Sequence, residues 1–172
     1  VEAINADLTA GGATGLDVTK AERLAENRES AFQGTKKVGD FDVAVETAIS
    51  WLGFPNPNGK SNAGVVKPSW NGLDVTRRLR DTWIIDFGTT MTEAEAALFE
   101  APFAHVLEQV KPQRIQNRRE SRAKNWWRHG DAQPPMRNAI KGLPRYIVTP
   151  EVAKHRIFVW ADAAISPDAA TV

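Results

Sequence analysis

The chain of 172 residues contains no cysteine, which excludes disulfide bonds and thiolate metal sites. Its three histidines, His105, His129 and His155, do not have the spacing of metal ligands on a helix or in a short loop, so a zinc site is not expected. No apolar run approaches the roughly 20 residues that cross a bilayer, and residues 1–5 lack the features of a signal peptide. We therefore expect a cytoplasmic protein with no membrane partner. The first residue is not Met, which suggests a piece of a longer protein.

Complete catalytic motifs are missing as well. Gly59-Lys60-Ser61 resembles the end of a phosphate-binding loop, but Phe54 stands where that motif needs its first glycine. The sequence has no Gly-x-Ser-x-Gly elbow and no Asn-Pro-Pro-aromatic motif of an adenine methyltransferase. Asp86 follows a hydrophobic run and is interpreted as a strand-end carboxylate, with a metal-dependent nuclease site as the alternative. The chain is therefore predicted to hold no catalytic centre, no metal and no cofactor of its own.

Positive charge is present, but it is concentrated in one part of the chain. Residues 111–156 contain twelve Lys or Arg and three Asp or Glu, a net charge of +9, whereas the rest of the chain carries −8. Charge separated in this way indicates a polyanionic partner. A solvated helix face is the ordinary alternative, but such a face usually mixes both signs. The pattern therefore favours contact with nucleic acid.

The order of the predicted elements indicates an α+β fold. We expect a linker or extended N-terminal arm over residues 1–30, with a short helix at 20–28. Residues 31–172 are expected to form a single compact domain, in which a short mixed or antiparallel sheet is flanked by helices. Its predicted strands are 31–35, 81–87, 145–149 and 156–160, and its predicted helices are 42–52, a longer stretch that opens at Thr92, and a run beyond Pro112. Residues 54–67 are predicted to be a loop from their Pro and Gly content.

Side-chain spacing predicts the packed residues. Helix 42–52 is expected to bury Val45, Ile49 and Leu52, and the helix after Thr92 is expected to begin with a Thr92–Glu95 capping box. Trp126 and Trp127 are adjacent on a predicted helix, so one is expected to pack and the other to be partly exposed. The other predicted core residues are Phe32, Trp83, Ile84, Ile85, Phe103, Val106, Leu107, Val110, Phe158 and Trp160.

The basic residues suggest how DNA would be held. Arg114, Arg118 and Arg122 recur every fourth residue, which predicts a basic stripe along one helix face. Glycines beside Lys36 and Lys37 would let a DNA backbone approach, and a basic turn would join the two last strands. The predicted DNA-binding residues are Lys36, Lys37, Arg114, Arg118, Arg119, Arg122, Lys124, Arg128, Arg137, Arg145, Lys154, His155 and Arg156.

Several segments, in order along almost the whole chain, resemble one family. They are residues 4–9, 32–42, 68–78, 83–87 and the long run from Glu100 through Trp126-Trp127 to Trp160. Together they resemble the region that follows the methyltransferase core in MmeI-like, single-chain restriction-and-methylation enzymes. That resemblance is carried by the whole series of segments rather than by any one motif.

The resemblance implies a function for the chain as part of a larger bacterial enzyme. In that family the preceding domains hold the nuclease and the S-adenosylmethionine-dependent adenine N6-methyltransferase. The matching region links the methyltransferase to the target-recognition domain and forms much of that domain, so the implied partners are double-stranded DNA and the preceding methyltransferase domain. The S-adenosylmethionine would bind elsewhere in the parent enzyme. No base-reading residue is carried over, because the family places most of these farther toward the C-terminus.

Two alternatives remain open at the level of sequence. The basic region could dock an acidic protein or the methyltransferase domain itself, which would make the chain a protein-interaction or scaffold module. A small nuclease would instead need a cluster of metal-binding carboxylates around Asp86.

Overall fold

The computed structural model describes residues 22, 24–27 and 29–171. The chain divides into two compact units, Val1–Ala31 and Phe32–Val172. The described residues of the first unit contain a 3-10 turn, η2, at Ala25–Asn27, and the Ser30 hydroxyl donates to the Glu26 carbonyl at 3.2 Å. A helix was predicted at 20–28, and within the described residues of that range the structure has this 3-10 turn. The arm predicted over residues 4–19 lies outside the described residues.

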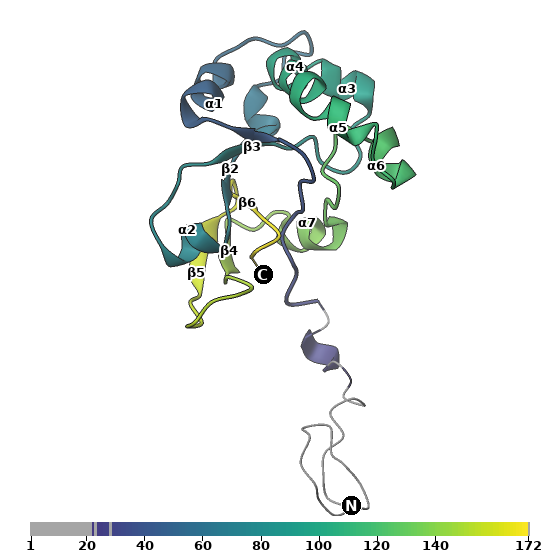
Figure 1. Ribbon diagram of the computed structural model, residues 1–172. Helices are drawn as coiled ribbons and strands as arrows, with labels where there is room; N and C mark the ends of the chain where they lie inside the picture. Colours follow the sequence, from purple (N-terminus) through teal and green to yellow (C-terminus); the bar gives the residue numbers. More distant parts are fainter. Residues whose placement is uncertain (1–21, 23, 28, 172) are drawn as a thin grey trace, which may run out of the picture. The chain divides into compact units, whose positions relative to one another are not determined.

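The second unit has the predicted α+β fold (Figure 1). Its helices are α1 Val45–Leu52, α2 Gly72–Thr76, α3 Glu93–Ala97, α4 Glu100–Gln109, α5 Lys111–Arg114, α6 Glu120–Lys124 and α7 Pro134–Ile140, with a 3-10 turn, η3, at Asn62–Gly64. Its strands are β1 Asp42–Val43, β2 Val66–Trp70, β3 Trp83–Ile85, β4 Arg145–Val148, β5 Val159–Asp162 and β6 Ser166–Pro167. None of the helices in the described part of the chain is long and apolar enough to cross a membrane.

Two separate sheets organise this unit. A four-stranded mixed sheet has the order β1-β3-β2-β6, in which only β6 runs parallel to its neighbour, and β4 pairs with β5 as an antiparallel hairpin. Strand β2 was not predicted, because Pro68 lies inside it and residues 54–67 have the composition of a loop. The amide of Ser69 donates to the carbonyl of Thr82, just before β3, at 2.8 Å, so Pro68 directs its nitrogen toward the opposite edge of the strand. Pairing with β6 begins only at Ser69, and the missing amide proton of Pro68 therefore costs no ladder hydrogen bond.

The main core lies between the four-stranded sheet and helices α1, α3 and α4. Ile84 and Ile85 of β3 are buried as predicted, and the capping box of Thr92 and Glu95 begins α3. Helix α4 buries Val106, but the predicted core residue Leu107 is exposed. The remaining residues of this core are Phe41, Val43, Ala48, Val65, Val66, Phe87, Ala96, Phe99, Val110, Trp126 and Trp127, with Trp51, Leu52, Trp83, Met91 and Phe103 packed against them.

The buried face of α1 differs from the predicted one. Ile49 is exposed, whereas Ala48 is fully buried and Trp51 and Leu52 pack on the core. Ala48, Trp51 and Leu52 lie at i, i+3 and i+4 and share the face that meets the core, so the prediction holds for Leu52. It was wrong for Ile49, because the core covers the side of the helix centred on Ala48.

Trp126 and Trp127 are both buried, which corrects the prediction that one would be partly exposed. They follow α6 in a turn instead of continuing a helix, so they are not held on different helix faces. Trp126 packs against Phe103 with ring centroids 5.5 Å apart, and the indole nitrogen of Trp127 donates to the Met91 carbonyl at 3.0 Å. Both rings thereby join the turn after α6 to the core.

Arg114 is the most unusual buried residue of the fold. Its side chain is 2% exposed, and its guanidinium donates to five backbone carbonyls at 2.8–3.3 Å. These carbonyls belong to Lys37, Val38, Arg122, Asn125 and Arg128. Burial, together with the nearby charge of Arg122, lowers the pKa of the Arg114 guanidinium. All its hydrogen-bonding capacity is therefore used to join segment 37–38 to the turn after α6.

Residues 34–39 form the central connection of this unit. The amide of Thr35 donates to the Pro167 carbonyl at 2.9 Å, and the amide of Lys36 donates to the Asp131 carbonyl at 2.9 Å. The strand predicted at 31–35 is thus present only as isolated bridges. The approach at Gly34 is close, because a Cβ added there would lie 2.2 Å from the Asp168 carbonyl oxygen.

Replacing Arg114 tests its structural role. Arg114→Met is expected to lower the free energy of unfolding by more than about 3 kcal/mol, since each buried carbonyl left without a donor costs about 1–3 kcal/mol. Arg114→Lys should recover only part of the loss, because an ammonium has three donors and no planar fork. Urea unfolding followed by circular dichroism measures both, with the exposed Arg118→Met as control. An Arg114→Met protein as stable as that control would contradict this role.

Candidate nucleic-acid interface

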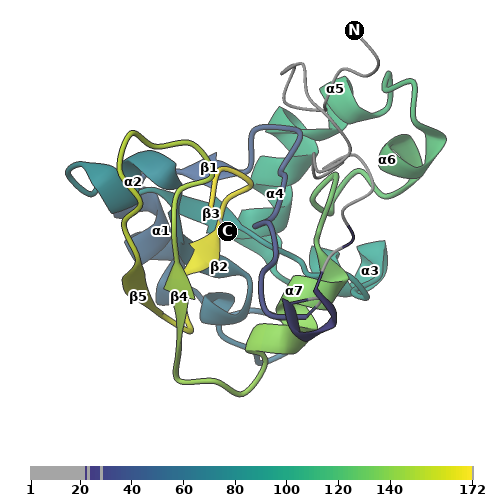
Figure 2. The ribbon, with the colours of Figure 1, turned by 90° about the horizontal axis from the view of Figure 1, so that it is seen from below.

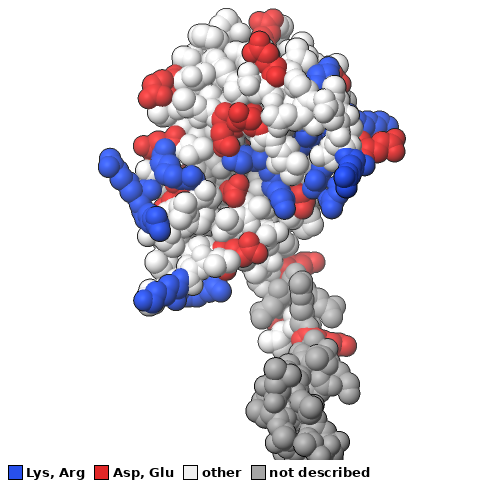
Figure 3. All heavy atoms as spheres, in the orientation of Figure 1, with Lys and Arg blue, Asp and Glu red and all other residues white. Residues whose placement is uncertain are grey.

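The thirteen predicted DNA-binding residues do not form one surface. The exposed ones lie in separate groups, and Figure 3 shows basic side chains gathered over α2, at the β4–β5 end and over α5–α6, with acidic side chains between them. Of the others, Lys37, Arg114, Arg128 and Arg137 are engaged within the protein by hydrogen bonds or ion pairs, and Arg122 is half-buried. The basic residues between 111 and 156 therefore divide into two kinds: some stabilise the fold from inside, and others lie exposed at the surface.

The predicted basic helix stripe is wrong. Helix α5 ends at Arg114, and α6 begins only at Glu120, so Arg114, Arg118 and Arg122 do not share one helix face. Arg114 is buried with all its donors engaged and cannot contact DNA. Arg122 is half-buried, and its carbonyl accepts a hydrogen bond from Arg114 at 3.2 Å.

Arg137 is also an internal residue. Its guanidinium makes two hydrogen bonds to the carboxylate of Asp86, at 2.7 and 3.1 Å, and a third to the Ala132 carbonyl. The Asp86 side chain is 2% exposed, so this is a buried ion pair. Burial by itself would raise the pKa of Asp86, but neighbouring His129 and Arg137 outweigh it and hold this pKa well below its usual range. Arg137 is therefore corrected from a DNA contact to the partner of Asp86.

The same contacts argue against Asp86 as a metal ligand. One of its oxygens accepts from the Gly88 amide at 2.9 Å, and both accept from Arg137. Within the residues described, no group of three or more potential ligands lies close enough together to hold a metal ion. Asp86 is thus a carboxylate at the end of β3 that pairs with Arg137, in line with its interpretation from the sequence as a strand-end carboxylate.

His129 lies beside this ion pair in the core. Its Nε2 is 2.9 Å from the Ile85 carbonyl, and its ring meets Phe41 edge-on with centroids 4.9 Å apart. Burial lowers the pKa of His129, against the opposing effects of the Asp86 carboxylate and the Ile85 hydrogen bond. His129 is therefore a packed residue that helps to close the buried end of β3.

Two further predicted contacts are largely satisfied within the fold. Arg128 donates twice to the Met91 carbonyl, at 2.6 and 3.0 Å, and lies 5.2 Å from the centroid of the Trp127 ring. Lys37 pairs with Asp42 at 2.6 Å and lies 3.9 Å from an oxygen of Asp168. Both cations stabilise junctions between segments.

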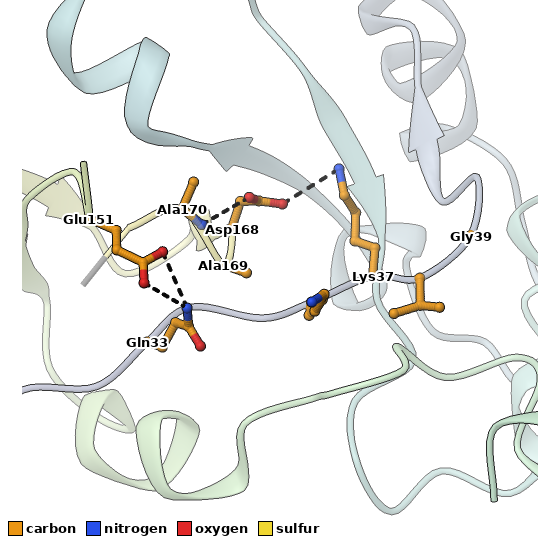
Figure 4. Close-up of a pocket in the computed structure, with 9 residues that line it drawn as sticks. Gln33, Lys37, Gly39, Glu151, Asp168, Ala169 and Ala170 are labelled. Atoms are coloured by element: carbon orange, nitrogen blue, oxygen red, sulfur yellow. Dashed lines mark hydrogen bonds and ion pairs between the residues drawn. The ribbon is translucent and has the colours of Figure 1, made fainter. Parts of the chain in front are cut away.

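A shallow depression of about 470 Å³ surrounds Lys37 (Figure 4). Its polar groups are paired across it, since Gln33 donates to Glu151 on one side and Lys37 meets Asp168 on the other. Lys36 lines the same depression with an exposed side chain. The depression thus offers one exposed cation, Lys36, and one cation that is already paired, Lys37.

The first exposed basic group lies on the connection from α5 to α6. We call Arg118, Arg119 and Lys124 the α6 group, and all three side chains are exposed. In the described part of the chain, none of them lies within ion-pair distance of a carboxylate. They are available to an anionic partner.

The second exposed group lies on the β4–β5 hairpin. Strand β4 alternates exposed and buried residues, so Tyr146 and Val148 pack inward with Ala161 of β5, while Arg145 and Ile147 face outward. The register places Ile147 opposite Trp160. Together with the loop residues Lys154, His155 and Arg156, which are exposed, this outer surface is mixed basic and apolar.

Phe158 and Trp160 were predicted to be core residues, but they are 65% and 54% exposed. The prediction was wrong because the sheet has only two strands and one packed face: Trp160, opposite the outward-facing Ile147, falls on the other face, and Phe158 lies in the loop before β5. The Arg145 guanidinium lies 4.1 Å from the centroid of the Trp160 ring. Strand β5 also begins at Val159 and not at Arg156, which leaves 156–158 in the connecting loop.

Arg77 and Arg78 are exposed cations that the sequence interpretation missed. They follow α2, whose Val75 packs against the hairpin cluster of Tyr146, Val148 and Ala161. Figures 1 and 2 both show α2 beside the hairpin. The run Arg77-Arg78-Leu79-Arg80 was a usable signal, but it lies outside residues 111–156, where the charge was counted.

The Asp86–Arg137 pair predicts a specific pH dependence. Arg137→Met should lower the free energy of unfolding by about 3–5 kcal/mol at pH 7, since it leaves a buried carboxylate unpaired. Because the folded-state pKa of Asp86 is depressed, its stabilising effect is present above the unfolded-state pKa of about 4 and is lost as the pH falls below it. The difference between wild type and variant should therefore shrink from pH 7 to pH 3 in urea unfolding. A difference that stayed constant with pH would contradict the assignment, and Arg118→Met is the matched control.

No protein-family model, curated protein sequence or solved structure matches the chain.

Proposed function

We propose that this chain is a DNA-binding region that grips the backbone of a duplex and orients it for a partner domain. The observation that carries the proposal is the set of exposed cations that have no carboxylate partner among the described residues. This set includes Arg118, Arg119 and Lys124 of the α6 group, and Arg77, Arg78 and Lys154 around the hairpin. Such cations favour a polyanion, because phosphate contacts supply most of the affinity of a DNA-binding protein.

Within this proposal, the resemblance to MmeI-like enzymes supplies the biological setting. The chain would belong to the target-recognition region of an S-adenosylmethionine-dependent DNA adenine N6-methyltransferase in a bacterial restriction-modification enzyme. Phosphate contacts fix register and orientation on the duplex, whereas sequence is read at base edges. A module of this kind assists a methyltransferase that must extrude its target base, which costs a few kcal/mol.

Salt dependence tests the proposal directly. The protein is expected to bind a fluorescein-labelled duplex of 20 base pairs at low salt, and the logarithm of the affinity should fall linearly with that of the salt concentration. Arg118→Glu with Arg119→Glu should reduce both the affinity and the slope of this line, because two phosphate contacts are lost. Fluorescence anisotropy between 50 and 200 mM NaCl measures both quantities.

The control for this charge reversal is Lys60→Glu with Lys141→Glu. It changes the net charge equally at exposed residues outside the α6 group and the hairpin. Equal loss in both double variants would indicate a general charge effect and would contradict a local interface. No binding at low salt by the folded wild-type chain would overturn the proposal. Arg122 is avoided because its backbone belongs to the Arg114 network.

Exposed apolar residues favour a protein-docking role as the second candidate. Leu107 of α4 and Ile115 after α5 are 42% and 56% exposed, close in sequence to the α6 group. A scaffold module that docks the methyltransferase domain or an acidic partner would use such residues together with the cations. Loss of assembly with the methyltransferase domain in Arg118→Glu/Arg119→Glu, with duplex binding retained, would favour this candidate over DNA binding.

A further inference from the structure

The outer face of the β4–β5 hairpin carries an aromatic surface that the fold leaves uncovered. We call Ile147, Phe158 and Trp160, with the Arg145 guanidinium over the Trp160 ring, the hairpin platform. We propose that the hairpin platform binds unpaired nucleic-acid bases by stacking, so that the protein prefers a duplex with bases out of the helix to a fully paired one. The inference rests on the proposed function, and it names the class of DNA that the site selects.

Strand register places two of the platform side chains together, since Ile147 lies directly opposite Trp160 on the outer face of the hairpin. Exposed Phe158 comes from the connecting loop, just before β5 begins at Val159. The other face of the hairpin is fixed, because Tyr146 donates its hydroxyl to the Ile165 carbonyl at 2.7 Å and Ala161 is fully buried. The platform is thus a surface of large rings supported by a packed layer.

The charge around the platform favours an anion with planar groups. Arg145 lies over the Trp160 ring at 4.1 Å, and planar guanidinium and indole groups both stack on bases. Lys154 and Arg156 are exposed on the connecting loop, and Arg156 is anchored by a hydrogen bond to the Pro150 carbonyl at 2.9 Å. From Arg145 to Asp162 the chain carries three Lys or Arg against two acids, Glu151 and Asp162. Cations beside exposed rings match phosphates beside bases.

This chemistry distinguishes a base from the interior of a paired duplex. In a paired duplex the bases stack on each other, and an exposed ring gains nothing from their faces. An unpaired or extruded base has an uncovered face, and its stacking on an aromatic side chain typically contributes about 1–3 kcal/mol. The loop cations would hold the flanking phosphates at the same time. The platform would therefore favour distortion of the duplex, the state that a base-extruding partner needs.

Trp160 provides a direct signal for the test. Trp51, Trp70 and Trp83 are half-buried and Trp126 and Trp127 are buried, so Trp160 is the exposed tryptophan of the described chain. The emission that Trp160→Phe removes therefore reports on the platform. Base stacking should quench that part of the emission, and heparin, a polyanion without bases, should not.

The experiment compares two labelled 20-base-pair duplexes, one fully paired and one with a two-nucleotide bulge. Wild-type protein is expected to bind the bulged duplex about tenfold more tightly, with quenching of Trp160. Phe158→Ala and Trp160→Ala should each remove most of this preference and leave the affinity for the paired duplex nearly unchanged. Ile49→Ala, at an exposed apolar residue of α1, is the matched control and should keep the preference. Circular dichroism verifies that each variant is folded.

Several outcomes would overturn the inference. Equal affinity for the two duplexes, without quenching of Trp160, would refute the platform while leaving duplex binding and its salt dependence intact. A blue shift of Trp160 on anionic phospholipid vesicles, without quenching by the bulged duplex, would assign the surface to lipid. Loss of the preference in Ile49→Ala as well would show that the effect is not local. Absence of binding to either duplex would refute the proposed function and the platform together.

Discussion

The buried guanidinium of Arg114 is the interaction on which the second unit of the fold depends. Its side chain lies between segment 37–38 and the turn after α6, where it donates five hydrogen bonds to backbone carbonyl oxygens. A turn rich in carbonyls cannot be buried by apolar side chains, because each carbonyl would lose its hydrogen bond to water. An arginine offers five donors in a fixed plane and satisfies them together. Trp126 and Trp127 then pack on the core from a turn held in this way.

Buried charge therefore has a structural role in this protein, and it separates the basic residues into two classes. Arg114 and Arg137 stabilise the interior, whereas Arg118, Arg119 and Lys124 remain at the surface. The two classes are adjacent in sequence because α5 and α6 are short and the chain turns between them. The hydrogen bonds of Arg114 to the backbone of Arg122 and Asn125 would help to position the exposed cations of the α6 group. Cations orient a duplex only when they are held at fixed positions, because phosphate contacts set the register of the protein on DNA.

The β4–β5 hairpin follows a different principle. One face of this two-stranded sheet packs on a small cluster around Tyr146, Val148 and Ala161. Within the described fold, no further layer covers the opposite face. Apolar side chains on that second face cannot be explained by packing within the unit. Their position next to α2 and to the loop cations makes the hairpin a distinct surface, separate from the α6 group. Backbone grip and base contact would then be divided between two parts of one small domain.

The sequence alone determined the features that depend on neighbours along the chain. The Thr92–Glu95 capping box, the buried strand around Ile84, the new helix α5 that begins beside Pro112 and the final hairpin all follow from local spacing and composition. Only the tertiary structure decided that Pro68 lies in a strand, that Arg114 is buried and that Phe158 is exposed. Spacing specifies which residues share a face, but burial depends on whether another layer meets that face, and distant parts of the chain supply that layer. For the same reason the regular spacing of Arg114, Arg118 and Arg122 predicted a basic helix face that does not form, because the chain turns between α5 and α6.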